Sequence, residues 1–248
     1  VPELAVLSAR NSDGRGLVEV KNAFGAANPQ SVWAGPGLSA VDVEAIDDAD
    51  GNGVPEVAIL AARNSDGRVL VEVKNADGPT NANVIWFMPG HAAVDLAVVP
   101  DKDSNGVPEV AVLTSRISDG RNVVEVKNVS GPTAPSAVWL STGYTALQVA
   151  AINDADGNLV PEVAILSTRN TDGQIMVEVK NAAGPTNPQT VGYATGFVAK
   201  NMVITDDIDN NGIEEAAILM IRDTDGRLVV QRRNMSGAPA PVNYFFSP

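Results

Sequence analysis

A unit of 53 residues occurs four times in this chain and begins a fifth time. Each unit opens on a similar stretch, for example VPEVAILAARNSDGR at residues 54–68. Self-similarity at one fixed period is the signature of folds in which neighbouring units stack on one another. Because the repeat covers the whole chain, we expect one domain over residues 1–248, built from the units 1–53, 54–106, 107–159, 160–212 and 213–248.

Each unit contains four short stretches typical of β-strands and none with a sustained helical period. In the second unit, residues 56–62 are almost continuously apolar, which predicts a strand buried on both faces. The sequence NSDG at 64–67 predicts a hairpin turn. Residues 68–74 alternate, and we expect Glu72 and Lys74 on a solvent-facing side. Two further strands are expected at 84–88 and 94–99.

These units predict an all-β fold, a β-propeller of four-stranded blades, with a linear β-solenoid as the alternative. We expect the inner strands at residues 41–46, 94–99, 147–152 and 202–206. Four complete blades then follow, and residues 1–36 supply only the last three strands of another, in which Val1 and Glu3 match the end of the junction loop described below. The expected count is about five blades, one of them incomplete.

Charge and composition narrow the classes of partner. The formal net charge is −13 and the isoelectric point is near 4.4, which argues against a nucleic-acid partner. Cysteine is absent, so neither disulfides nor thiolate metal sites are expected. No apolar run approaches the ~18 residues that predict a membrane span, and no signal peptide is recognisable.

The junction between units carries the candidate chemistry, a nine-residue loop with the pattern Asp-x-Asp-x-Asn. Alternate residues of a tight loop converge, and oxygen atoms are the ligands that Ca²⁺ takes. Positions 1, 3, 5 and 9 offer side-chain oxygens, and position 7 offers a backbone carbonyl. The predicted ligands are Asp48, Asp50, Asn52, Val54 and Glu56; Asp101, Asp103, Asn105, Val107 and Glu109; Asp154, Asp156, Asn158, Val160 and Glu162; and Asp207, Asp209, Asn211, Ile213 and Glu215.

Three other interpretations of this loop are less favoured than calcium binding. Asp, Asn and Gly also favour turns without any metal, but four copies in one register, each with a carboxylate at position 9, favour calcium. An EF-hand would place its last carboxylate later and continue into a helix. Magnesium tolerates a flexible multi-carboxylate cage less well. The weakest of the four sites is expected at Asp154–Glu162, because Leu159 stands where the other loops have glycine.

The loop and the strands around it resemble the FG-GAP (VCBS-like) calcium-binding repeats of integrin-type β-propellers. The resemblance covers the whole chain, although no literal Phe-Gly…Gly-Ala-Pro is present. It implies that the loop joins the first and second strands of a blade and that the residues named above bind the ion. It also implies an extracellular or cell-surface protein that acts in adhesion, in contact with carbohydrate or as a scaffold.

The sequence leaves three functions open. The first is a calcium-binding structural or adhesive module that contacts a protein or glycan at the cell surface. The second is a multivalent lectin that uses Trp33, Trp86 and Trp139, although apolar cover between blades is the favoured role for these rings. The third is self-assembly, even into an extracellular filament, through a strand donated to the incomplete blade.

No catalytic site is expected. His91 is the only histidine, and we expect it in an exposed loop. The hairpin residues Asp66 and Arg68, with their counterparts in the other units, including Asp13, are expected to form turns and cross-hairpin pairs. Asn128 and Asn234 fit the N-glycosylation pattern, and we expect both at the periphery, where a glycan would be accommodated.

Overall fold

The structure is a computed structural model, and it describes residues 3–10, 12, 14–22, 30–78, 83–130, 135–184, 189–193, 195–235 and 242–245. These residues form strands and turns, without a helix that could cross a membrane. Val1, Asp13 and Ser236, the serine of the Asn234 glycosylation pattern, lie outside the described residues, as does the side chain of Glu3. The expectations that rest on these groups therefore stay predictions.

The described strands form five antiparallel sheets, each a meander of strands in chain order. The first sheet has three strands, β1 (Glu3–Ala9), β2 (Gly16–Asn22) and β3 (Gln30–Trp33). The second has β4 (Leu38–Ile46), β5 (Glu56–Arg63), β6 (Val69–Asn75) and β7 (Asn83–Trp86). The third has β8 (His91–Val99), β9 (Glu109–Arg116), β10 (Asn122–Asn128) and β11 (Ser136–Trp139).

The fourth sheet has β12 (Tyr144–Ile152), β13 (Glu162–Arg169), β14 (Ile175–Asn181) and β15 (Gln189–Gly192). The fifth has β16 (Phe197–Thr205), β17 (Glu215–Arg222), β18 (Leu228–Asn234) and β19 (Val242–Phe245). The all-β prediction, with four strands per unit and three in the first sheet, is confirmed. The first strand of each four-stranded sheet begins three to five residues earlier than the apolar pattern predicted.

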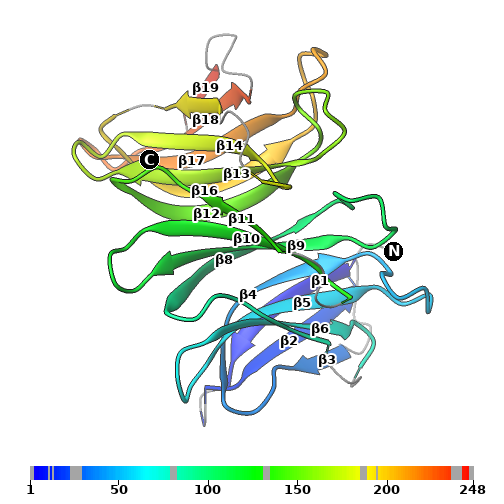
Figure 1. Cartoon of the computed structure of the whole chain (residues 1–248). Helices are drawn as coiled ribbons and strands as arrows, with labels where there is room; N and C mark the ends of the chain where they lie inside the picture. The colour runs from blue at the N-terminus through cyan, green and yellow to red at the C-terminus, as the bar shows by residue number, and fades with distance from the viewer. Residues whose placement is uncertain are drawn as a thin grey trace.

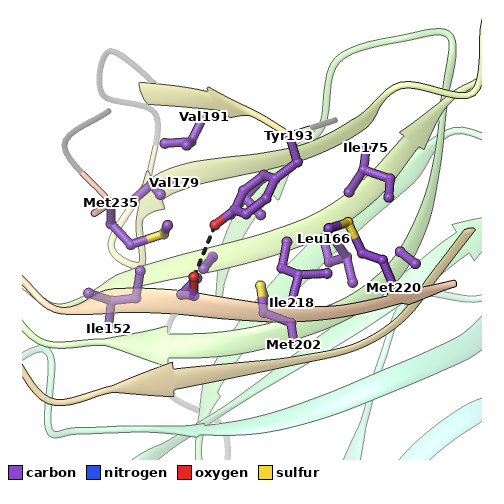
Figure 2. Close-up of a cluster of buried hydrophobic side chains, with 14 of the residues drawn as sticks. Ile152, Leu166, Ile175, Val179, Val191, Tyr193, Met202, Ile218, Met220 and Met235 are labelled. Atoms are coloured by element: carbon purple, nitrogen blue, oxygen red, sulfur yellow. Dashed lines mark hydrogen bonds between the residues drawn. The ribbon is translucent and has the colours of Figure 1, made fainter. Parts of the chain in front are cut away.

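The five sheets stack face to face in chain order, from β1–β3 at one end to β16–β19 at the other (Figure 1). Apolar clusters fill the spaces between successive sheets. Figure 2 shows the cluster between the fourth and fifth sheets, in which the Tyr193 hydroxyl donates to the Ala216 carbonyl at 3.2 Å. Because neighbouring sheets cover both faces of β5, β9 and β13, these strands are continuously apolar and buried.

The first strands of neighbouring sheets are joined by a repeated polar contact. Each of β4, β8, β12 and β16 carries a register shift, and the residue after it is Asp42, Asp95, Gln148 or Asn201. The Asp42 carboxylate accepts the Leu96 N–H at 3.2 Å, and the equivalent residue pairs are Asp95 with Val149 and Gln148 with Met202. The bulge therefore aims a polar side chain at the next sheet.

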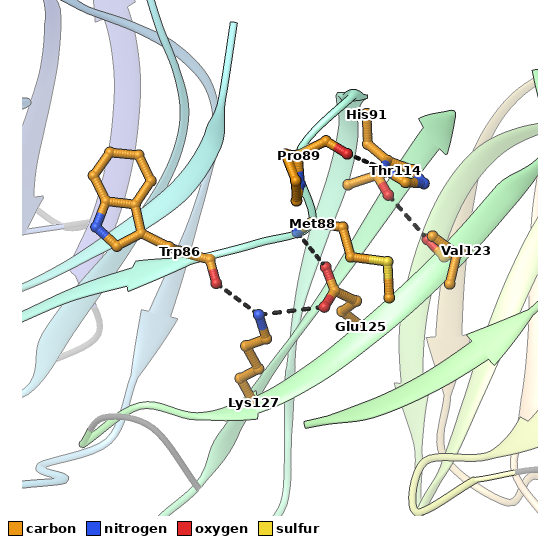
Figure 3. Close-up of polar contacts among 8 residues, drawn as sticks. All are labelled: Trp86, Met88, Pro89, His91, Thr114, Val123, Glu125 and Lys127. Carbon is orange, nitrogen blue, oxygen red and sulfur yellow. Dashed lines mark hydrogen bonds and ion pairs between the residues drawn. The ribbon is translucent and has the colours of Figure 1, made fainter. Parts of the chain in front are cut away.

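The expectation that Glu72 and Lys74 face solvent is wrong. Glu72 is only 6% exposed, and its carboxylate lies 3.0 Å from the Lys74 ammonium group. Glu72 accepts the Gly35 N–H of the preceding sheet, and Lys74 donates to the Trp33 carbonyl of that sheet. The same inter-sheet contact recurs in the two following sheets, and Figure 3 shows it between Met88, Trp86, Glu125 and Lys127. The alternating face of β6 therefore packs against another sheet.

His91 is also placed differently from the prediction. It begins β8 and is 5% exposed, and its ring lies 6.2 Å from the Trp139 ring. Its Nδ1 lies 3.1 Å from the Pro89 carbonyl oxygen, as Figure 3 shows. The residue is buried because β8 begins earlier than expected.

The main ion pair of four hairpin turns uses the arginine before the turn. Of the arginines that were expected to pair, Arg227 also contacts its turn aspartate, Asp225, at 3.5 Å. Arg63, which precedes the turn, forms the two-point ion pair with Asp66, whereas Arg68 donates only its backbone N–H to that carboxylate. The two arginines both lie over the Trp86 ring, each at 4.7 Å from its centroid. Trp33 and Trp139 carry two arginines in the same way. The aromatic rings are thus packing elements of the hairpins.

The two candidate glycosylation residues are not at an open periphery. Asn128 is 1% exposed and Asn234 is 3% exposed. The Asn128 side-chain oxygen accepts hydrogen bonds from both the N–H and the hydroxyl of Ser130. These side chains belong to the folded core, which contradicts the expectation that a glycan would be accommodated there.

Candidate metal centres

The four junction loops bring together the carboxylates that the sequence singled out. Each loop lies between the first and second strands of a sheet, as the resemblance implied. In each, one oxygen of the position-1 Asp, one of the position-3 Asp and one of the position-9 Glu lie within 4.8 Å of one another. The four clusters are Asp48, Asp50 and Glu56; Asp101, Asp103 and Glu109; Asp154, Asp156 and Glu162; and Asp207, Asp209 and Glu215.

The position-1 aspartate organises the loop backbone. Asp48 accepts hydrogen bonds from the N–H groups of Gly51, Asn52 and Gly53, at 2.7 to 3.0 Å. In the second loop, desolvation acts to raise the pKa of Asp101, but hydrogen bonds from Gly106 and Asn105 outweigh it and the pKa is lowered. The position-1 carboxylate is therefore held ionised. This part of the geometry is also what a metal-free Asx turn would show.

The side-chain oxygen of the position-5 asparagine accepts a hydrogen bond from within the loop. The Asn52 side-chain oxygen accepts the Val54 N–H at 2.7 Å, and the other three loops repeat this contact at 2.8 to 2.9 Å. An amide oxygen has two lone pairs, so one is left for a cation. No contact among the described residues tests the position-7 carbonyls of Val54, Val107, Val160 and Ile213 as ligands, so their role stays a prediction.

Turn chemistry does not explain the environment of the position-9 glutamate. Glu56, Glu109 and Glu162 are 0 to 4% exposed, because each begins the buried second strand of its sheet. One carboxylate oxygen accepts the backbone N–H of loop position 2, at 2.7 to 2.9 Å. The other oxygen, Oε1, is buried without a hydrogen-bond partner in each of these three residues. Native proteins leave few buried polar atoms unsatisfied, so these three oxygens require an explanation.

The raised pKa values of the position-9 glutamates also indicate a bound cation. Burial raises the pKa of Glu109 and Glu162 to about 7, with the neighbouring aspartates adding to the shift. Burial also raises the pKa of Glu56. Three carboxylates confined in one loop repel one another, and a divalent cation would remove both that repulsion and the unsatisfied oxygen. The residues present therefore fit a metal ion with a preference for oxygen ligands.

The third loop contains the strained residue that the sequence predicted. Leu159 has a φ of 68°, where Gly53, Gly106 and Gly212 have φ between 84° and 87°. Its side chain is 88% exposed and makes no compensating contact in the core. The loop still closes, because the Leu159 N–H donates to Asp154 at 2.7 Å. Leu159 therefore makes the same loop hydrogen bond as Gly53, Gly106 and Gly212.

A small cavity adjoins the first loop. Asp50 and Glu56 line it, together with Asn75 and Asn83 on β6 and β7. In the second loop, Lys102 reaches across the corresponding space, and its ammonium group contacts the Ser136 hydroxyl at 3.3 Å. The four loops are thus alike in their carboxylates and different in their surroundings.

No protein-family model matches this chain, and no curated protein matches it in sequence.

Proposed function

We propose that this protein is a calcium-binding β-propeller module of a secreted or cell-surface protein, with a structural or adhesive role. The five sheets would be its blades, and the repeated contacts between first strands would line its centre. The resemblance of the junction loops to FG-GAP repeats supports this proposal. The four-stranded meanders and their face-to-face stacking are consistent with it.

The observation that carries the proposal is the unsatisfied Oε1 of Glu56, Glu109 and Glu162, each beside two aspartates. An oxygen-only donor set without histidine or cysteine favours a hard cation over zinc or copper. Calcium accepts the larger and less regular coordination shell that such a loop provides, whereas magnesium demands a near-ideal octahedron. The carboxylates at positions 1, 3 and 9 would hold the ion, with the position-5 amide and the position-7 carbonyl as further ligands.

An extracellular location fits the expected affinity of these loops. Two of the three carboxylates in the first loop are exposed, and weak calcium sites of this open kind are filled at the millimolar concentrations found outside cells. The role of the ion would be structural: it would fix the start of each second strand relative to the loop. A non-catalytic module is consistent with the use of these carboxylates as ligands.

The lectin alternative gains no support from the tryptophans. Trp33, Trp86 and Trp139 are half-buried, and two guanidinium groups lie over each ring. A ring that stacks on arginine is engaged in packing and offers less free surface to a sugar.

The test is a thermal melt in chelator, in magnesium and in millimolar calcium, with bound metal counted on the same samples. Each site filled at ~100-fold its dissociation constant adds about 2.7 kcal/mol to the free energy of unfolding. We expect a calcium-specific rise and up to four bound ions, with the weakest site in the third loop. An unchanged melt with no bound metal would show that the loops are turns only.

A further inference from the structure

The cavity beside the first junction loop lies where the second sheet meets the third. Its volume is about 120 Å³, and ~10–15 Å³ is enough for one water molecule, so it has room for a small organic group. Asp50 and Glu56 of the second sheet and Ser130 of the third are among its lining residues. Asp50 and Ser130 are exposed, so the cavity is open to solvent.

The rest of the lining combines apolar and neutral polar groups. Val73 and Val129 are 7% and 2% exposed and supply the apolar part. Asn75, Asn83 and Ser130 supply amide and hydroxyl groups, which both donate and accept hydrogen bonds. The Asn83 amide donates to the Val129 carbonyl, and this contact holds its side chain at the sheet junction. A ligand with hydroxyl groups on an apolar carbon frame matches such a lining.

Two of the three carboxylates of the first candidate metal centre, Asp50 and Glu56, line this cavity. Glu56 is 4% exposed, and its Oε1 has no hydrogen-bond partner. An ion held by these carboxylates would therefore border the cavity. The loop offers five predicted protein ligands, whereas calcium takes ~6–8 oxygens, so at least one coordination position is left for an oxygen from outside the loop.

The charge of the site selects the class of ligand. The three carboxylates of the cluster exceed the two charges of a calcium ion, so a loaded site stays negative. Among the described residues that line the cavity, Asp50 and Glu56 are the only charged ones. A carboxylate or phosphate ligand would meet repulsion there without a cationic side chain to offset it. The neutral vicinal hydroxyls of a saccharide meet no such repulsion, and they offer the ion two oxygens at once.

The second junction loop shows how such a space is closed. Its second position is Lys102, where the first loop has Ala49. The Lys102 ammonium group contacts the hydroxyl of Ser136, and Ser136 stands where the second sheet has Asn83. The lysine thus occupies the space that is open beside the first loop. It also brings a positive charge next to the metal centre, which the first loop lacks.

We propose that the first junction loop is a calcium-dependent saccharide site, in which two vicinal hydroxyl groups complete the coordination of the ion and the cavity receives the adjoining edge of the sugar ring. The inference rests on the proposed function, because it requires calcium in that loop. It differs from a lectin built on Trp33, Trp86 and Trp139, because it uses no tryptophan and places one site at one sheet junction. For a ligand with about 12 non-hydrogen atoms, a dissociation constant of about 1 mM is expected.

The experiment first counts the calcium bound to the protein. A glycan array is then screened in calcium and in chelator, and the free monosaccharide of the strongest hit is titrated to ~10 mM by calorimetry, tenfold above the expected dissociation constant. Ala49→Lys copies the second loop and changes no predicted ligand, so it should keep the calcium and lose the sugar. Ala155→Lys, the same change in the third loop, is the matched control and should keep both.

A second variant tests the cavity without a new charge. Asn83→Ser introduces the residue that the third sheet has at this position, and it should keep the calcium and weaken sugar binding by about 3- to 10-fold, the effect of one lost hydrogen bond. Bound calcium without any array signal would overturn this inference and leave the proposed function standing. So would sugar binding that persists in chelator or in Ala49→Lys. A protein that binds no calcium would overturn the proposed function as well.

Discussion

Replacement of Glu109 by a neutral residue should stabilise the protein without calcium and remove the stabilisation that calcium gives. Glu109 is completely buried, its Oε2 accepts the Lys102 N–H at 2.9 Å, and its Oε1 has no partner. Burial raises its pKa from 4.5 to about 7. A raised carboxyl pKa means that stability falls as pH rises from the unfolded-state value to the folded-state value, and the full penalty is present above pH 7.

The substitution is Glu109→Gln, and the free energy of unfolding is measured above pH 7. In chelator the neutral amide keeps the bond to Lys102 and removes the buried charge, so the variant should be more stable by up to about 3 kcal/mol, which is the pKa shift converted to free energy. In calcium the wild-type chain gains about 2.7 kcal/mol from the ion at ~100-fold its dissociation constant, and the variant loses most of that gain. The advantage of the variant should therefore disappear.

The assay is a set of thermal melts of both proteins in chelator and in calcium. The difference in stability between the two proteins should change by about 2.7 kcal/mol from chelator to calcium. That change corresponds to roughly 5–10 °C in melting temperature for a domain of this size. Glu44→Gln is the control, because the pKa of Glu44 is also raised to about 7 but its side chain is exposed on β4, outside the loops, so its effect should be the same in chelator and in calcium. A Glu109→Gln difference that is equal in chelator and in calcium would refute the reasoning.

Further substitutions test three other parts of the structure. Leu159→Gly should raise stability by about 1 kcal/mol in urea titrations, because the left-handed φ of 68° costs a side chain that packs on nothing; a loss of stability would show that the loop needs the side chain. Burial raises the pKa of Asp95 to about 7, so Asp95→Asn should stabilise the protein at pH 8, change little at pH 4, and flatten the fall in stability between about pH 4 and 7. Lys127→Met should cost about 3–5 kcal/mol, because it leaves the buried Glu125 carboxylate without its cation. Lys21→Met, where the same pair is 33% and 48% exposed, should cost under about 1 kcal/mol; equal losses at the two positions would contradict the inter-sheet role.

The sequence predicted best where a residue's environment depends on its own unit. The hairpin at residues 64–67 and the buried β5 follow from local turn chemistry and from a continuous apolar run. The carboxylate clusters follow from alternate positions in one short loop. In these cases the controlling contacts lie within a few residues of one another, so a pattern in the sequence determines them.

The sequence predicted poorly where the environment comes from the neighbouring sheet. The alternation of Glu72 and Lys74 with valine is the same whether their face contacts water or another sheet, because each charge satisfies the other. The partners of this pair lie 37 and 41 residues away, at Gly35 and Trp33. One signal was available: the pair recurs in four units, although a charged pair on a solvent-facing side has no need of an identical partner in each unit.

Contacts between sheets also determine how such a chain can change its length. The hydrogen bonds that Asp42 accepts from Leu96, Asp95 accepts from Val149 and Gln148 accepts from Met202 all span 54 residues. Each sheet is thus matched only to the sheets beside it. Gain or loss of one whole 53-residue unit would recreate the same junction on either side and leave the other contacts intact. A gene that encodes this chain can therefore lengthen or shorten its product by unequal recombination without first evolving a new interface.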